Sequence, residues 1–316
     1  MSAEYAACFL VGPTASGKTA VAQWMAEREG FDILSADSML VYEGMDIGTA
    51  KPTAAERARV AYHGLDVTTP DRPFSVWDYS CHAHRVLADA EARGRRVLVV
   101  GGTGLYVKSL THGLRETPAP DPALRAQWDR ILRDEGAAAL QEALRLRRPD
   151  LYAALRDPAN GRRLIRALEL AQADAAPPGG TWRTAASSAP LAGLQLSVAD
   201  LHSRIESRVG RMYNAGFIGE VEALLRRYPV FSETARQAIG YAEAMDVLAG
   251  RCSREEAVQR TIVRTRQLAK RQMTWFRRQA DVRWIRVTPR MGIPEIAVEA
   301  LEHWRQWGPT PIRGAT

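Results

Sequence analysis

Short apolar runs alternate with amphipathic stretches in the first third of the chain. Candidate strands cover residues 6–11, 32–37 and 96–100, and the second of them has a polar end. Between the first two, residues 20–29 have helical character and are followed by Gly30, a common helix terminator. Uninterrupted apolar strands separated by helices are typical of a parallel sheet that is covered on both faces. The pattern therefore predicts an α/β core.

The pattern changes after residue 114. Pro118, Pro120 and Pro122 interrupt the chain, and residues 123–173 are rich in Ala, Leu and Arg with helical periodicity. Residues 174–190 form a Pro- and Gly-rich connection, and helical periodicity returns from residue 200. We expect one core domain made of residues 1–114 and 198–316, interrupted by an all-helical insertion domain at residues 115–197.

A basic segment near the C-terminus predicts contact with a polyanion. We expect one long helix over residues 255–279. The segment from Arg251 to Arg290 contains twelve Arg or Lys residues but only three acidic ones. Trp275 and Phe276 lie among these arginines, as on an RNA-binding surface. The alternative is a solvated helix face. The net charge of +7 favours a nucleic-acid partner but is weak evidence alone.

The cysteines and the hydropathy limit the compartment. The three cysteines, Cys8, Cys81 and Cys252, are far apart and lack metal-ligand spacing. The apolar run at residues 6–11 is too short for a membrane span or a signal peptide. We expect a cytoplasmic protein that does not bind a membrane.

A glycine-rich loop predicts phosphate binding. It lies between a predicted strand and a predicted helix and matches G-x-x-x-x-G-K-T. In such a loop the backbone N–H groups turn inward, Lys18 supplies positive charge and the Thr19 hydroxyl binds Mg²⁺. We expect the cradle to consist of Gly12, Pro13, Thr14, Ala15, Ser16, Gly17, Lys18 and Thr19.

The phosphate loop leaves several functions open. NTPases and kinases usually hold Mg²⁺ with an Asp at the end of another strand, but the strand at residues 96–100 ends in Gly-Gly-Thr-Gly. The nearest acid is Asp37, so the loop could instead hold a diphosphate leaving group while Asp37 acts on the nucleophile. A small-molecule kinase and a non-catalytic RNA-binding protein that uses a nucleotide as a switch are the alternatives.

Six further blocks resemble the tRNA dimethylallyltransferase family. They are SADSM (35–39), VYEGMDIGTAKP (41–52), GGTGLY (101–106), RALE (166–169), IGY (239–241) and TRQLAKRQMTWFR (265–277). With the phosphate loop they occur in order along nearly the whole chain. The resemblance implies a P-loop NTPase-like core and a monomeric, Mg²⁺-dependent enzyme. Such an enzyme moves a dimethylallyl group from dimethylallyl diphosphate to N6 of the adenine 3′ to the anticodon in the tRNA anticodon stem-loop, and releases diphosphate.

The resemblance also implies roles for individual residues. Asp37 would be the general base, although a Mg²⁺ ligand or a structural acid is an alternative. Arg208 would lie near the diphosphate, with Arg204 one turn away as a competing candidate. A turn hydroxyl for Thr103 and an exposed charged helix face for the arginines are alternatives to tRNA binding. The tRNA-contacting residues would be Asp37, Ser38, Met39, Leu40, Thr103, Arg125, Arg162, Arg163, Leu164, Ile165 and Arg166.

Six residues at four places in the chain depart from the family pattern. Leu40 stands where a glutamine is usual, and Gly219 stands where an acid is usual. Ala159-Asn160 replaces Asn-Asp, and Ser197-Val198 replaces Asp-Arg. These changes concern tRNA recognition more than the phosphate loop.

Overall fold

The computed structural model describes residues 5–114, 117–118, 121–155, 157–174 and 190–314. Two compact units are formed, one by Met1–Leu114 with Ala185–Ala315 and the other by Arg115–Thr184. We call the first the core unit and the second the helical unit, and each is described by itself.

The core unit is built on a mainly parallel sheet. In the described part of the chain its strands follow the order β3-β2-β4-β1-β5-β6, and β7 pairs antiparallel with the start of β1. The strands are β1 (Tyr5–Val11), β2 (Phe31–Ser35), β3 (Tyr62–His63), β4 (Arg96–Gly101), β5 (Leu191–Gln195), β6 (Val282–Arg286) and β7 (Thr310–Ile312).

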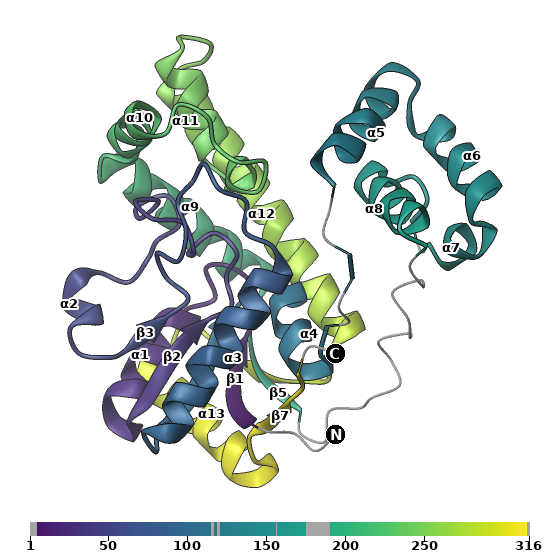
Figure 1. Cartoon of the computed structure of the whole chain (residues 1–316). Coiled ribbons are helices and arrows are strands. Elements are labelled where there is room, and N and C mark those ends of the chain that lie inside the picture. The colour runs from purple at the N-terminus through teal and green to yellow at the C-terminus, as the bar shows by residue number, and fades with distance from the viewer. Residues whose placement is uncertain (1–4, 115–116, 119–120, 156, 175–189, 315–316) are drawn as a thin grey trace. The chain divides into compact units, whose positions relative to one another are not determined.

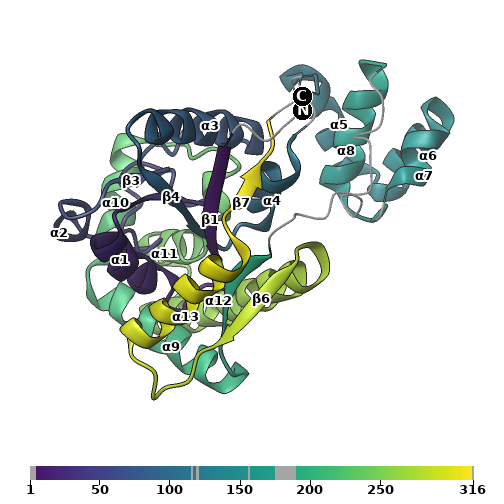
Figure 2. The ribbon, with the colours of Figure 1, turned by 90° about the horizontal axis from the view of Figure 1, so that it is seen from below.

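Helices cover both faces of this sheet. Figure 2 shows α3 on one side of the strands and α1 with α13 on the other. The core unit's helices are α1 (Lys18–Glu29), α2 (Ala54–Arg57), α3 (Val76–Ala92), α4 (Gly104–His112), α9 (Val198–Asn214), α10 (Phe217–Arg227), the 3₁₀ helix η1 (Ala235–Gln237), α11 (Tyr241–Leu248), α12 (Arg254–Gln279) and α13 (Ile293–Trp307).

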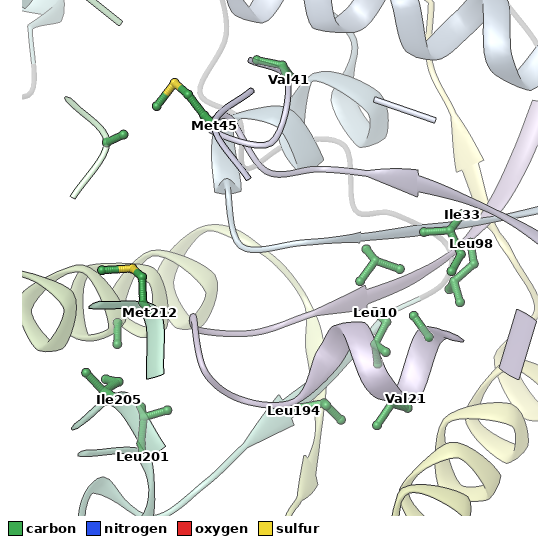
Figure 3. Packing of buried hydrophobic residues seen from close by; sticks show 14 of the residues in the cluster. Leu10, Val21, Ile33, Val41, Met45, Leu98, Leu194, Leu201, Ile205 and Met212 are labelled. Atoms are coloured by element: carbon green, nitrogen blue, oxygen red, sulfur yellow. The ribbon is translucent and has the colours of Figure 1, made fainter. Parts of the chain in front are cut away.

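Alternation along β1 explains why both faces are apolar. Leu10 packs in one hydrophobic cluster, whereas its neighbours Phe9 and Val11 pack in the cluster on the opposite face. In the first cluster Leu10 lies beside Val21 of α1 and Leu194 of β5 (Figure 3). The apolar side chains of β1 therefore pack on both faces of the sheet, as expected for a sheet that is covered by helices on both sides.

The parallel register brings three strand ends to one edge of the sheet. Val11 pairs with Gly101, and Ser35 pairs with Val100, so β1, β2 and β4 end side by side. The chain segments that follow these strands are the phosphate loop, Ala36-Asp37 and the Gly102-Thr103 turn. Crevices at the carboxyl ends of parallel strands are the usual binding sites of open α/β sheets.

The helical unit has a hydrophobic core of its own. Trp128, Leu140, Leu144 and Leu168 are buried in one cluster. Its helices are α5 (Pro122–Asp134), α6 (Ala137–Arg147), α7 (Pro149–Ala154) and α8 (Gly161–Gln172) (Figure 1).

Most predicted elements are present, but one boundary was wrong. The strands at residues 6–11, 32–37 and 96–100 correspond to β1, β2 and β4, and the helix at 255–279 is α12. The predicted helical insertion includes residues 191–195, but in the structure these residues form β5 between β1 and β6 of the core sheet. Their sequence, LAGLQ, contains Ala and Gly rather than β-branched residues, so pairing with distant strands decides the outcome. Nearly all of the predicted Pro- and Gly-rich connection lies outside the described residues.

None of the described helices combines the length and the apolar character that a membrane span needs.

Replacing Leu10 with alanine should destabilise the core unit strongly. Leu10 is fully buried at the centre of the sheet, and the change removes apolar contacts and leaves a cavity. We expect the free energy of unfolding to fall by about 2–5 kcal/mol in urea titrations followed by circular dichroism. Val198→Ala, at a position that is 69% exposed, serves as the control and should change it little. Equal effects of the two variants would contradict the assigned core.

Candidate active site

The phosphate loop ends at an uncapped helix. The left-handed backbone of Gly17, with φ of 95°, turns the chain into α1, and this conformation favours glycine. No side chain caps α1, so the N–H groups of its first turn stay available to a ligand. The positive end of the helix dipole adds to their attraction for an anion. Local geometry therefore makes an anion site here.

Lys18 is held inside this loop. Its Nζ donates to the Pro13 carbonyl oxygen at 2.7 Å and to Ser16 Oγ at 3.4 Å. Burial lowers the pKa of Lys18 to about 8; Asp37 opposes this shift and Arg208 reinforces it. A buried ammonium that bonds only neutral oxygens is poised to gain from a bound anion.

Helix α9 adds arginines to the same site. Arg204, Arg208 and Arg211 are spaced so that they share one side of the helix. An adjacent side, with Leu201, Ile205 and Met212, packs into the hydrophobic core (Figure 3). The apolar side thus fixes the direction in which the arginines project.

The hydrogen bonds of these arginines go to neutral oxygens. Arg204 donates to the Ser16 carbonyl at 3.3 Å, and Arg211 donates to Ser207 Oγ at 2.6 Å. Arg208 donates to Thr14 Oγ1 at 3.1 Å and to the Thr49 carbonyl at 3.0 Å. Burial lowers the pKa of Arg208, with Asp37 opposing the shift and Arg211 reinforcing it.

A cavity of 720 Å³ collects these groups. The phosphate loop from Thr14 to Thr19 and the three arginines supply its polar lining, and we call it the donor cavity. Leu40, Ile47 and Met212 supply an apolar part. Both candidates for the diphosphate contact, Arg204 and Arg208, therefore line the same space. Leu40, predicted to contact tRNA, lines this cavity as well.

A second cavity of 380 Å³ shares a wall with the first. Ser38, Met39 and Thr103 line only this one, which we call the acceptor cavity. The residues common to both cavities are Thr14, Asp37, Thr49, Arg208, Met212 and Gln272.

Asp37 lies at this shared wall and keeps acceptor capacity. Its Oδ1 accepts the Met39 N–H at 2.9 Å, which orients the side chain. Among the described residues no other hydrogen bond to its carboxylate is found. Asp37 can therefore accept a proton from a group in either cavity.

Thr103 supports the turn next to Asp37. Its Oγ1 accepts the Ser38 N–H at 3.0 Å and donates to Ser38 Oγ at 3.3 Å. Thr103 thus acts as a turn hydroxyl, which is the alternative to tRNA binding. Because Thr103 also lines the acceptor cavity, it remains accessible to a substrate.

Gln272 of α12 was not anticipated from the sequence. Its Oε1 accepts the Thr14 N–H at 2.8 Å, and its Nε2 donates to the Gly102 carbonyl at 3.1 Å. One side chain thereby connects the phosphate loop to the turn after β4. Its place within the TRQLAKRQMTWFR block is the only signal that could have indicated it.

The helical unit pairs two of the predicted tRNA-binding arginines with one buried acid. Arg125 Nε and Nη2 donate to both carboxylate oxygens of Glu169 at 2.7 and 3.0 Å. Arg166 Nη1 donates to the same Glu169 at 3.0 Å and remains 30% exposed. Arg162 and Arg163 are exposed on α8.

Leu164 and Ile165 differ from the neighbouring arginines. Both are buried in the hydrophobic core of the helical unit, because α8 is amphipathic. Their side chains are therefore not available to RNA in this unit, and the prediction that they contact tRNA is not supported for the side chains.

A divalent ion would need ligands from a substrate. The described residues include no cluster of three or more His, Cys, Asp or Glu side chains that could hold a metal. Thr19 lines the donor cavity at the start of α1. Mg²⁺ commonly takes few protein ligands and completes its shell with phosphate oxygens and water, so this arrangement fits it.

The fold is that of a P-loop-like α/β protein, and its donor cavity, lined by Lys18 and three arginines, lies at the carboxyl edge of the sheet. Sequence models of the IPP transferase and isopentenyl transferase families match residues 40–279 and 6–63. The chain belongs to the IPP transferase family.

Relatives and solved structures agree with this assignment. A tRNA dimethylallyltransferase of Geobacter sulfurreducens is 43% identical over 280 residues, covering 87% of this chain and 89% of that protein. The crystal structure of a tRNA isopentenylpyrophosphate transferase from Bacillus halodurans matches with a TM-score of 0.68 at 35% identity and covers 96% of this chain and 98% of that one. A eukaryotic dimethylallyltransferase acting on tRNA shares the fold, with a TM-score of 0.74 at 23% identity over 95% of this chain and 76% of that one.

The pKa of Lys18 predicts a pH dependence of anion binding. Protonated Lys18 attracts the anion, so binding should be strongest below pH 8 and weaken above it. In the Lys18→Arg variant the cation stays protonated throughout. By calorimetry, the affinity of the wild type for inorganic pyrophosphate should fall about tenfold relative to this variant between about pH 7 and pH 9. Parallel pH profiles would contradict the lowered pKa, since ionisation of pyrophosphate affects both proteins equally.

Proposed function

We propose that this protein transfers a dimethylallyl group from dimethylallyl diphosphate to N6 of the adenine 3′ to the anticodon in tRNA and releases diphosphate. One observation carries the proposal. Lys18, Arg204, Arg208 and Arg211 surround the donor cavity, and within the described part of the chain their hydrogen bonds go to neutral oxygens. Asp37 lies where this cavity meets a second one. Membership of the IPP transferase family supports the same reaction.

The donor would bind with its diphosphate on the phosphate loop. The first-turn N–H groups of α1 and the guanidinium of Arg208 would stabilise the negative charge that develops on the diphosphate oxygens as diphosphate departs. The dimethylallyl chain would lie toward Leu40, Ile47 and Met212, the apolar part of the donor cavity. Positive charge on the allylic carbon spreads over its double bond, which makes departure of diphosphate easier.

The acceptor adenine would enter the acceptor cavity from an unstacked position. Its N6 attacks C1 of the donor, the C1–O bond breaks, and its electron pair leaves with diphosphate. The N6 proton passes to the carboxylate of Asp37, which acts as general base. Ser38 and Thr103 would contact the base from the lining of this cavity.

Mg²⁺ would be held by the Thr19 hydroxyl together with oxygens of the donor diphosphate. When bound, it neutralises negative charge on the diphosphate. The residues of the chain would still orient the donor, exclude water and move the proton.

The partner we propose is the anticodon stem-loop. Arg264 and Arg271 of α12 line the acceptor cavity. Arg264 pairs with the buried Glu243 at 2.5 Å, so Arg271 would supply the phosphate contact beside the target base.

In the helical unit, the exposed Arg162 and Arg163 would bind the RNA backbone. The portions of the Arg125 and Arg166 side chains that remain exposed beside Glu169 would contact it as well. We also propose that the protein acts as a monomer, and the proposed tRNA substrate suits the cytoplasm.

A small-molecule kinase remains the rival function. It would need ATP in the donor cavity and a small hydroxyl compound beside its terminal phosphate. The absence of an acid after β4, where P-loop enzymes usually hold Mg²⁺, favours the transferase.

Replacing Asp37 with asparagine tests the proposed general base. The protein is incubated with Mg²⁺, dimethylallyl diphosphate and unmodified tRNA, and the nucleosides are analysed by mass spectrometry. The wild type should add five carbons to one adenine. Because the amide cannot take the N6 proton, the variant should be slower by about 10²-fold or more, while its tRNA affinity stays close to that of the wild type.

The matched control is Asp71→Asn, at an exposed acid that lines neither cavity and should leave the rate unchanged. Unchanged turnover in the Asp37 variant would refute the general base. Phosphoryl transfer from ATP to a small molecule, with no change in the RNA, would refute the transferase itself.

A further inference from the structure

Glu220 makes an unusual set of hydrogen bonds outside both cavities. It lies in the first turn of α10 and faces the segment that follows the SADSM block. Its Oε2 accepts the N–H groups of Asp46 at 3.0 Å and Ile47 at 2.6 Å, and its Oε1 accepts the Gly48 N–H at 3.2 Å. Three consecutive backbone N–H groups therefore converge on one carboxylate, as in the anion-binding nests of protein backbones.

A fourth donor fixes the carboxylate itself. The Tyr241 hydroxyl donates to Glu220 Oε1 at 2.7 Å. Burial, reinforced by the Glu220 carboxylate, holds the pKa of Tyr241 well above its usual range, so the hydroxyl stays a donor. Hydrogen bonds to an ionised acceptor are among the stronger ones in proteins. Glu220 is thus anchored from α11 while it holds residues 46–48.

The segment also packs tightly against two aromatic rings. A Cβ atom added at Gly48 would come within 2.3 Å of the Phe217 ring and 2.5 Å of the Tyr241 ring. The backbone of residue 48 therefore rests directly on α10 and α11, and the N–H groups that Glu220 binds are held close to it.

The segment held by Glu220 forms a wall of the site. Ile47, Thr49 and Ala50 line the donor cavity, and Gly48 and Thr49 line the acceptor cavity. The carbonyl of Thr49 accepts a hydrogen bond from Arg208 Nη2 at 3.0 Å, and the other Arg208 nitrogen, Nη1, donates to Thr14 on the phosphate loop. The orientation of the Arg208 guanidinium thus depends on where the segment places the Thr49 carbonyl.

We propose that Glu220 is a positioning residue for the donor. It holds residues 46–48 so that the Thr49 carbonyl directs Arg208 toward the phosphate loop and Ile47 closes the apolar part of the donor cavity. Glu220 itself lines neither cavity and acts only through these groups. The inference rests on the proposed function in that Arg208 is taken to bind the donor's diphosphate.

The test is the variant Glu220→Gln. Glutamine keeps the size of the side chain but turns one acceptor oxygen into an NH₂ group that faces N–H donors. Two quantities are measured: the dissociation constant of inorganic pyrophosphate by calorimetry, and the donor and tRNA KM values in the transfer assay. We expect a pyrophosphate Kd and a donor KM about tenfold higher, equivalent to about 1.4 kcal/mol, with the tRNA KM unchanged.

Two further variants keep the test decisive if Glu220→Gln folds poorly. Tyr241→Phe removes one donor and retains the carboxylate, so it should shift the same constants in the same direction by a smaller factor. Glu222→Gln, on the same helix, changes an exposed acid that pairs with Arg226 and should have no effect.

The outcomes separate a positioning role from a structural one. A lower kcat with unchanged donor KM and pyrophosphate Kd means loss of folded enzyme only and overturns the proposal, as does equality of Glu220→Gln with Glu222→Gln. A higher pyrophosphate Kd in Glu220→Gln supports the positioning role even if the acceptor is not tRNA, because pyrophosphate binding is measured without group transfer.

Discussion

The site depends on positive charge for which the described residues provide no salt bridge, although Asp37 lies near enough to favour the charged forms of Lys18 and Arg208. Lys18 and three arginines of α9 surround one cavity, and their hydrogen bonds go to carbonyl and hydroxyl oxygens. Partly removing such groups from water costs free energy, which is visible in the lowered pKa of Lys18. In the proposed function a diphosphate would offset this cost when it binds. The donor would then complete an electrostatic arrangement that the fold leaves unbalanced.

The sheet makes this arrangement possible by placing three strand ends together. The phosphate loop, Asp37 and the Gly102-Thr103 turn follow β1, β2 and β4, whose pairing register aligns their last residues. Helix α9 completes the site because its apolar side is locked into the core while its arginines face the loop. In the proposed reaction, the fold would thus set the distance between the departing diphosphate and Asp37. Asp37 lies where the donor and acceptor cavities meet.

The parts of the site that could be predicted from the sequence are those encoded over short distances. The loop at residues 12–19, Asp37 after β2, and Arg204 and Arg208 of α9 each follow from local pattern or from the family resemblance, whereas Arg211 was not predicted. Gln272 lies in a block that carries the family resemblance, but local pattern reveals neither its role nor that of Glu220, because their partners, Thr14 and residues 46–48, lie far away in sequence. A lone Gln or Glu on a helix carries no sign of the backbone N–H groups it will meet.

The fold shows the same division. The apolar strands β1, β2 and β4 were predictable because they are buried on both faces, whereas β5, with Ala and Gly among its five residues, is a strand only through pairing with β1 and β6. The segment at residues 162–166 contains both surface and core positions. Its arginines at 162 and 163 are exposed, whereas Leu164 and Ile165 are buried, and only the helical period distinguishes the two kinds of position.

The most direct test is a crystal structure with an anticodon stem-loop and a dimethylallyl thiodiphosphate that cannot react. We expect the diphosphate on the N–H groups of Gly17, Lys18 and Thr19 with Arg208 beside it, and the target adenine in the acceptor cavity with N6 next to Asp37. A diphosphate bound away from the phosphate loop, or an adenine whose N6 lies out of reach of Asp37, would contradict this expectation.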